Sequence, residues 1–301
     1  MPICPLIYCF VHCQKSFFEV YFPGEKAEKS LQKRGKAVNI CMMSLMMDEY
    51  PVKRIVDTAI SCGMKAIDWI GLHGKSAAEL KKLCHDAGLP VAAHTMLKWG
   101  FIRDKANYLD EFKASLDDAC IMGAKVLMLP PFARQNQSSL ADDRKRYAGY
   151  FAEAYELSAK AGITLTLEST GFGNSPITTA DECLEILHQV PGLKITFDHG
   201  NTATADDPLA SFAKLREYVV HFHLKDWHIY DESVPGGDLK RCGKYFADAA
   251  IGTGDLDIRG FWDTVTEKER ELPVNLETKD YSGQTAPENF FAALCGRLQS
   301  W

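Results

Sequence analysis

Short apolar runs alternate with segments of helical periodicity from residue 36 to the end of the chain. Eight of these runs have the length of strands, and they begin near Val38, Ala66, Val91, Ala124, Ile163, Leu193, Val219 and Pro273. Six of the seven intervals between these starts are 25 to 39 residues long, and the last is 54 residues long. The shorter intervals each fit one strand, one helix and two loops.

The intervening segments carry apolar residues at the three-to-four spacing of amphipathic helices. The clearest lie at 51–64, 76–89, 109–124, 146–162, 179–190 and 288–298, and several end in glycine, which commonly caps a helix. Eight βα units predict a parallel (β/α)8 TIM barrel, whose active site lies at the C-terminal ends of the strands. A doubly wound open sheet would need a glycine-rich turn after the first strand, and residues 42–51 contain no glycine.

Composition fits one large barrel domain over residues 36–301 and argues against nucleic acid as a partner. The chain has 301 residues, 46% hydrophobic and 25% charged, and its net charge of −6 gives no basic surface for a phosphate backbone. Ten cysteines include no CxxC pair. This pattern is typical of a reduced, cytoplasmic protein.

Residues 1–35 form a predicted N-terminal extension. An apolar run at 2–13 has no basic segment before it and is too short to span a membrane, so we expect no membrane association. A charged helix or linker follows at 25–36. Cys4, Cys9, His12 and Cys13 lie close together there, but no second pair at ligand spacing completes a zinc site. The extension either packs against the bottom of the barrel or precedes the folded domain.

Four polar residues close the last four strand runs: Glu168, Asp198, His223 and Glu277. Apolar residues alternate with polar ones in each run, so each of these four lies on the face opposite the apolar side chains. The residues two positions earlier, Thr166, Thr196, His221 and Asn275, are also polar. An apolar outer face, a polar inner face and a charged tip indicate the mouth of a barrel.

Three carboxylates and one imidazole are suited to one divalent metal ion, with manganese, magnesium or cobalt favoured and zinc an alternative. Each residue has a structural explanation when taken singly. Either glutamate could pair with a basic residue, Asp198 could cap the next helix and His223 could be a core histidine. These explanations weaken for the set, because buried carboxylates repel one another without a cation.

Several further side chains are candidates for binding a substrate. They are Asp68 and His94, near the ends of the second and third strands; His199 and Asn201, after Asp198; Lys225 and Asp226, after His223; and Lys240 and Arg241. The last two lie in a loop at 227–256, which we expect to cover a polar substrate as a lid and to bind an anionic group. A solvated loop with scattered charge is the alternative.

The chain resembles the xylose isomerase-like barrels, which include ketose 3-epimerases, hydroxypyruvate isomerase and inosose dehydratase. The resemblance rests on LTLEST at 165–170, FDHGN at 197–201, VVHFHLKDW at 219–227, IGTGDLDIRGFW at 251–262 and VNLETKD at 274–280. It implies one divalent cation bound by Glu168, Asp198, His223 and Glu277. It also implies that Glu168 and Glu277 move protons through an enediolate of a small carbohydrate, and that Lys225 contacts a substrate or orients a ligand.

Three positions depart from the patterns of named relatives. Asn174 and Ile229 stand where ketose 3-epimerases have a glutamate and a basic residue, and Asn201 stands where endonuclease IV-type relatives have a histidine. We therefore expect an isomerase or epimerase acting on a small sugar, sugar phosphate or polyol ketone, with no nucleic acid partner. An inosose dehydratase-like lyase and a non-catalytic sugar-binding protein are the alternatives. The sequence is also compatible with a homo-oligomer.

Overall fold

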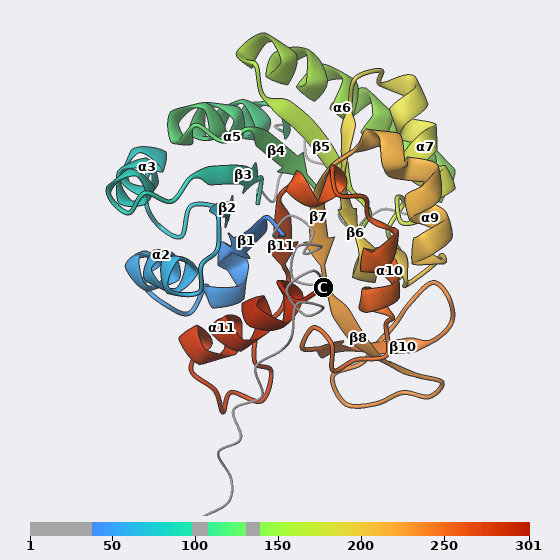
Figure 1. Ribbon diagram of the computed structural model, residues 1–301. Helices are drawn as coiled ribbons and strands as arrows, with labels where there is room; N and C mark the ends of the chain where they lie inside the picture. The colour runs from blue at the N-terminus through green and yellow to red at the C-terminus, as the bar shows by residue number, and fades with distance from the viewer. Residues whose placement is uncertain (1–37, 98–107, 131–138) are drawn as a thin grey trace, which may run out of the picture. The chain divides into compact units, whose positions relative to one another are not determined.

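The computed structural model describes residues 38–97, 108–130 and 139–301. In them, eight parallel strands close into a barrel in the order β1-β11-β7-β6-β5-β4-β3-β2, with helices between the strands (Figure 1). The predicted TIM barrel is therefore confirmed. The extension at 1–35, with its three cysteines and His12, lies outside the described residues.

The barrel strands occur where the apolar runs predict them. They are β1 (Ile40–Met43), β2 (Ala66–Ile70), β3 (Val91–Thr95), β4 (Val126–Leu129), β5 (Thr164–Glu168), β6 (Lys194–Asp198), β7 (Val219–Leu224) and β11 (Val274–Leu276). Since all eight run parallel, their C-terminal ends meet at one rim. Every residue predicted to be a metal ligand lies at this rim.

Helices surround the barrel, and six of them match the predicted amphipathic segments. The main helices are α2 (Val52–Ser61), α3 (Ala77–Asp86), α5 (Tyr108–Met122), α6 (Leu140–Ala161), α7 (Ala180–Gln189), α8 (His199–Thr202), α9 (Pro208–Leu215), α10 (Ile258–Thr264) and α11 (Pro287–Leu298), with 3-10 turns at Ser44–Met47, Arg216–Tyr218 and Glu269–Glu271. Capping boxes begin α3 and α7, and Gly162 ends α6 with φ of 72°. Along the described residues, no helix is both long and apolar enough to cross a membrane.

The two faces of the strands have different environments, as the alternation predicts. On the outer face, Phe197 and Phe222 pack with Phe212 and Phe261 from the surrounding helices, at ring-centroid distances of 5.3 to 6.3 Å. On the inner face, the polar residues two positions before the candidate ligands are fully buried. The main apolar core thus lies between strands and helices, and the inner faces of β5, β6, β7 and β11 are polar below the rim.

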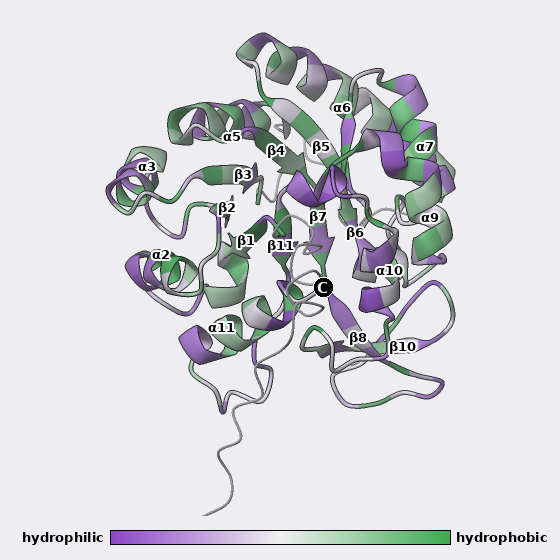
Figure 2. Cartoon of the chain, in the orientation of Figure 1, coloured by the Kyte–Doolittle hydropathy of each residue, from purple (hydrophilic) through white to green (hydrophobic). Residues whose placement is uncertain are grey.

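The long segment after β7 is folded, contrary to the prediction of a plain loop. It forms a three-stranded antiparallel sheet of β8 (Asp226–Tyr230), β10 (Tyr245–Ala249) and β9 (Asp238–Leu239). Figure 2 shows that β8 is largely hydrophilic, which hides its strand character in the sequence. The sheet is anchored by Trp227, which is buried and packs edge-on against Phe246.

Candidate metal centre

The four predicted ligands converge at the rim of the barrel. The donor atoms of Glu168, Asp198, His223 and Glu277 all lie within 4.8 Å of one another. The strand register explains this, because Asp198 is paired directly with His223 across β6 and β7. Glu277 follows β11, and its backbone N–H donates to the carbonyl of Leu224 at 2.9 Å, which fixes it beside the end of β7.

Three of the converging donor atoms are buried without a hydrogen-bond partner in the part of the chain that the structure describes. They are Glu168 Oε1, Asp198 Oδ2 and His223 Nδ1. His223 Nδ1 lies 2.6 Å from Glu168 Oε1, yet the geometry between them is not that of a hydrogen bond. The atoms therefore point toward a common location more than toward each other. Buried polar atoms without partners are costly, and a hard divalent cation would satisfy all three.

The electrostatics of this cluster also fit a cation. Burial raises the pKa of Asp198 well above its ordinary value, and Glu277 and Glu168 raise it further. Burial likewise raises the pKa of Glu168, against the opposing effect of His223. Burial would lower the pKa of His223, but the nearby carboxylates of Glu168, Asp68 and Glu277 raise it well above its ordinary value. These directions reflect the crowding of buried charges in the cluster, and a metal ion would offset the negative charge in competition with protons.

Glu277 is held by a lysine. The ammonium group of Lys225 donates a hydrogen bond to Glu277 Oε1, and the second oxygen of Glu277 lies 3.7 Å from His223 Nδ1. Burial would raise the pKa of Glu277, but Lys225 and His223 lower it. The predicted ligand-orienting role of Lys225 has a physical basis in this contact, which leaves one oxygen of Glu277 facing the cluster.

Asp198 serves as a helix cap as well as a candidate ligand. Its Oδ1 accepts the backbone N–H of Asn201 at 2.8 Å, at the start of α8, while its Oδ2 is the buried atom without a partner. The two interpretations offered by the sequence are therefore compatible. The cap fixes the carboxylate so that its second oxygen is directed toward the other three ligands.

The other candidate residues on this rim have mainly structural contacts. His94 Nδ1 lies 2.8 Å from the carbonyl of Trp69. His199 is buried, its ring lies 4.7 Å from that of Phe261, and burial lowers its pKa to about 4. Asn201 is buried beside Gly171. None of these contacts joins these side chains to the four candidate ligands.

Asp226 has a role that the sequence analysis missed. Both of its oxygens accept backbone N–H groups: Oδ1 from Trp227 and Leu256 at 2.9 and 3.3 Å, and Oδ2 from Gly252 and Gly254 at 2.8 and 3.0 Å. A Cβ at Gly254 would overlap the carboxylate. Asp226 therefore ties the GTGD segment to the end of β7. These four hydrogen bonds give Asp226 a structural role, and its substrate contact stays a prediction.

Arg241 also has a structural partner. Its guanidinium donates to both oxygens of Glu182 on α7, at 2.7 and 2.8 Å. Lys240 differs from its neighbour, because its ammonium group is buried 5.3 Å from the centroid of the Trp227 ring. In the described residues its ionic partner is Asp238: Lys240 Nζ lies 3.5 Å from Asp238 Oδ2, and the Asp238 side chain is 81% exposed. Of the two predicted anion-binding residues, Lys240 is thus the less completely paired.

A family model supports what the geometry indicates. Residues 56–296 match the model described as xylose isomerase-like TIM barrel. The chain belongs to this family. Among curated proteins, none matches it by sequence.

Several solved structures share the fold of this family member. It resembles the apo form of 3-keto-D-glucoside 4-epimerase from E. coli, with a TM-score of 0.69, 16% identity, and coverage of 88% of this chain and 100% of the other. The IolI protein with bound zinc gives a TM-score of 0.70 at 15% identity, and the match covers 87% of this chain and 98% of the other. The probable 3-DHS dehydratase from Bacillus anthracis gives a TM-score of 0.66 at 19% identity, and the match covers 86% of this chain and 98% of the other. At these identities the likeness concerns the fold alone.

In this xylose isomerase-like barrel, the inner polar layer supports the candidate metal centre from below. The hydroxyls of Thr166 and Thr196 lie 2.9 Å apart, and Thr196 lies 3.2 Å from His221 Nδ1. Burial, then the nearby His223, lowers the pKa of His221 to about 4. Asp68 and Asn275 complete the layer. The sequence predicted Asn275 on an inward face and Asp68 near a strand end, but it did not reveal that the two side chains meet.

Proposed function

We propose that this chain is a divalent-metal-dependent isomerase or epimerase acting on a small sugar, sugar phosphate or polyol ketone. The observation that carries the proposal is the convergence of Glu168 Oε1, Asp198 Oδ2 and His223 Nδ1, all buried and without hydrogen-bond partners. Membership of a family with epimerase and isomerase neighbours supports it at a coarser level. Buried acids arranged in this way are expected at sites that bind a ligand or carry out proton chemistry.

Glu168, Asp198, His223 and Glu277 would hold the metal ion. Their three carboxylates and single imidazole favour manganese, magnesium or cobalt, and zinc also fits because one structural neighbour contains it. When bound, the ion supplies a Lewis acid that polarises a substrate carbonyl. The barrel buries Glu168, Asp198 and His223, so these three side chains are shielded from bulk water.

Glu168 and Glu277 would move the proton. They come from β5 and from the end of β11, so they approach a substrate in the barrel mouth from different sides. One glutamate would take the proton from the carbon beside the carbonyl, giving an enediolate, and either glutamate would return it. Lys225 holds one oxygen of Glu277 and leaves the other available for this transfer.

Lys240 would bind an anionic group of the substrate, such as a phosphate or carboxylate. Its ammonium group is buried near Trp227, whose ring also lies 4.6 Å from the ammonium of Lys225. A buried ammonium group whose ionic partner is an exposed aspartate gains from an additional anion. This supports an acidic substrate over a neutral one.

A lyase of the inosose dehydratase type is the second candidate. It would share the first proton abstraction and then expel a β-hydroxyl group. Lys225 supports this alternative, since its ammonium group lies beside Glu277 and could protonate a leaving oxygen. Isomerase and lyase give different products from the same site.

One NMR experiment tests both candidates. Protein loaded with Mn²⁺ is incubated in deuterated buffer with a panel of ketoses, ketose phosphates and inososes, and the metal is removed before spectra are recorded. Deuterium uptake at the carbon beside the carbonyl, without loss of water, supports the isomerase or epimerase. Loss of water supports the lyase. If the protein binds no divalent metal under any condition, the metal-dependent proposal is wrong and a sugar-binding protein is favoured.

A further inference from the structure

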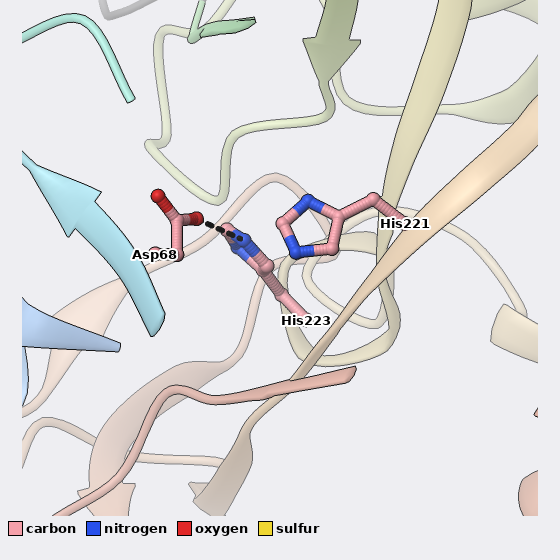
Figure 3. Close-up of side chains that lie close together, drawn as sticks. All are labelled: Asp68, His221 and His223. Carbon is pink, nitrogen blue, oxygen red and sulfur yellow. Dashed lines mark ion pairs between the residues drawn. The ribbon is translucent and has the colours of Figure 1, made fainter. Parts of the chain in front are cut away.

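The candidate metal centre is closed from below and open at one edge. Below the rim, the side chains of Asp68 and His221 lie against the ring of His223, and all three residues are fully buried (Figure 3). At the rim, the side chains of Lys225 and Glu277 remain 14% and 15% exposed. A substrate that enters from solvent would therefore pass these two side chains, which we call the open edge of the centre.

Just after β11 the chain makes a tight turn, and Tyr281 is the second residue of this turn. The backbone N–H of Gly283 donates to the carbonyl of Asp280 at 3.1 Å, which closes the turn. The Asp280 carboxylate accepts the N–H and the hydroxyl of Ser282 at 2.9 and 2.6 Å, and the N–H of Thr285 at 2.6 Å. These bonds fix the backbone that carries Tyr281.

The side chain of Tyr281 does not fill the space behind this turn. Asp280 and Gly283 line a small pocket there, opposite Glu49 and Tyr50. Tyr281 is not among the residues that line this pocket. Its side chain is therefore directed away from the pocket.

Charged groups at the open edge act on the hydroxyl of Tyr281. Burial raises the pKa of this hydroxyl, and the negative charges of Asp248 and Glu277 raise it further. The positive charge of Lys225 acts in the opposite direction. Asp248 belongs to the inserted sheet, where it is paired with Trp227 across β10 and β8. Tyr281 thus lies near both residues of the open edge, and its hydroxyl stays protonated at neutral pH as a hydrogen-bond donor.

The contacts of Tyr281 give it no structural role. In the described residues, no hydrogen bond, ion pair or ring contact joins its side chain to another residue, and the residue is 39% exposed. A tyrosine that stabilises a core buries its ring and finds a partner for its hydroxyl. Tyr281 instead presents an apolar ring and an unused donor beside the open edge, and these are the two groups that recognise the carbon chain and the hydroxyls of a sugar.

We propose that Tyr281 binds the substrate outside the metal site, with its ring against the carbon chain and its hydroxyl donating to a substrate hydroxyl. This rests on the proposed metal-dependent function. It narrows the substrate class to ketones that carry at least one hydroxyl group beyond the oxygens bound at the metal. A two-carbon or three-carbon acid would not reach Tyr281, whereas a sugar or a polyol ketone would.

Binding of three α-hydroxy acids to Mn²⁺-loaded protein, measured by calorimetry, tests the proposal. Glycolate, D-gluconate and D-galactonate share the same metal-chelating end, and the two sugar acids add a chain of hydroxyl groups. We expect the wild type to bind at least one sugar acid more tightly than glycolate. Tyr281→Phe should weaken that sugar acid about tenfold, and Tyr281→Ala about 100-fold because it also removes the ring. The affinities for glycolate and for Mn²⁺ should not change.

Tyr230→Phe is the matched control, because Tyr230 on β8 is also 39% exposed. It should bind all three acids as the wild type does. Equal affinity of the wild type for the three acids, unchanged affinity in both Tyr281 variants, or a loss that glycolate or Mn²⁺ shares overturns the role of Tyr281 and leaves the metal centre standing. Absence of Mn²⁺ binding in the wild type overturns the proposed function itself, and the role of Tyr281 with it.

Discussion

The candidate metal centre and the cluster around Glu182 both bury carboxylates, but they differ in how those groups are satisfied. Both oxygens of Glu182 accept hydrogen bonds from Arg241, and further donors are Arg144 and the backbone of Thr178 and Thr179, all within 3.2 Å. At the candidate metal centre, Glu168 and Asp198 each keep a buried oxygen without a hydrogen-bond partner in the described residues. A carboxylate with a full set of donors stabilises the fold, whereas converging carboxylates with unfilled oxygens indicate a missing ligand.

The largest expected effect is on catalysis. Glu277→Gln should abolish deuterium exchange into the substrate, by at least about 10³-fold, because the amide cannot accept the proton. The circular dichroism spectrum should be unchanged. Glu182→Gln is a control with the same chemical change at the satisfied carboxylate, and it should retain exchange. Equal activity losses in the two variants would remove the distinction between the clusters.

Metal affinity should show the next largest effect. Asp198→Asn keeps an oxygen to cap α8 but replaces the ligand charge, so we expect affinity for Mn²⁺ to fall by about 100-fold or more. The rise in unfolding temperature that Mn²⁺ gives the wild type should then disappear at the same metal concentration. Calorimetry measures the affinity for Mn²⁺, and thermal unfolding with and without Mn²⁺ measures the rise in unfolding temperature. A full metal-induced rise in this variant would exclude Asp198 as a ligand.

A substitution in the cluster around Glu182 should change the stability of the fold and leave metal binding unchanged. Glu182→Gln removes charge-assisted hydrogen bonds from two arginines, so the free energy of unfolding should fall by about 2 kcal/mol. Urea denaturation measures this change, and affinity for Mn²⁺ should remain that of the wild type. A loss of metal affinity would show that the two clusters are coupled.

The pH dependence of stability is a further test of the difference between Glu182 and the candidate metal centre. Burial would raise the pKa of Glu182, but Arg241 and the backbone N–H groups at the start of α7 lower it below the ordinary value of 4.5. A group whose pKa is lower in the folded state stabilises the protein above its unfolded pKa, and this contribution is lost as the pH falls. The stability difference between wild type and Glu182→Gln should thus be complete at pH 7 and should narrow below about pH 4.5. A stability difference that stays constant between pH 7 and low pH would contradict the lowered pKa of Glu182.

The smallest effect is expected for Lys240→Ala. If this lysine binds an anionic group, KM should rise by about tenfold for substrates with a phosphate or carboxylate and should hardly change for neutral analogues. Steady-state kinetics on each anionic substrate and its neutral analogue measures this difference in KM. Arg241→Ala, at the neighbouring position, should instead lower stability, because it removes the main partner of Glu182.

The sequence was sufficient to predict the barrel, all eight strands and the convergence of the four candidate ligands. Local periodicity decides these features, because alternation selects the inner face and parallel strands share one rim. The three-stranded sheet after β7 was missed, since β9 has only two residues and β8 and β10 mix polar with apolar residues. Contacts between distant strands were also missed. Asn275 reaches Asp68 across β1 only because the barrel closes, and a single sequence does not specify that distance.

The use of Asp226 as a tie has a consequence for how this fold can vary. One carboxylate holds the chain where the inserted sheet begins, at Trp227, and where it ends, at Gly252 and Gly254. The insertion therefore leaves and returns to the rim at a fixed point, whatever lies between. Its middle portion can change in length and composition without shifting Lys225 or His223. The segment after β7 can thus vary while the candidate metal centre stays in place.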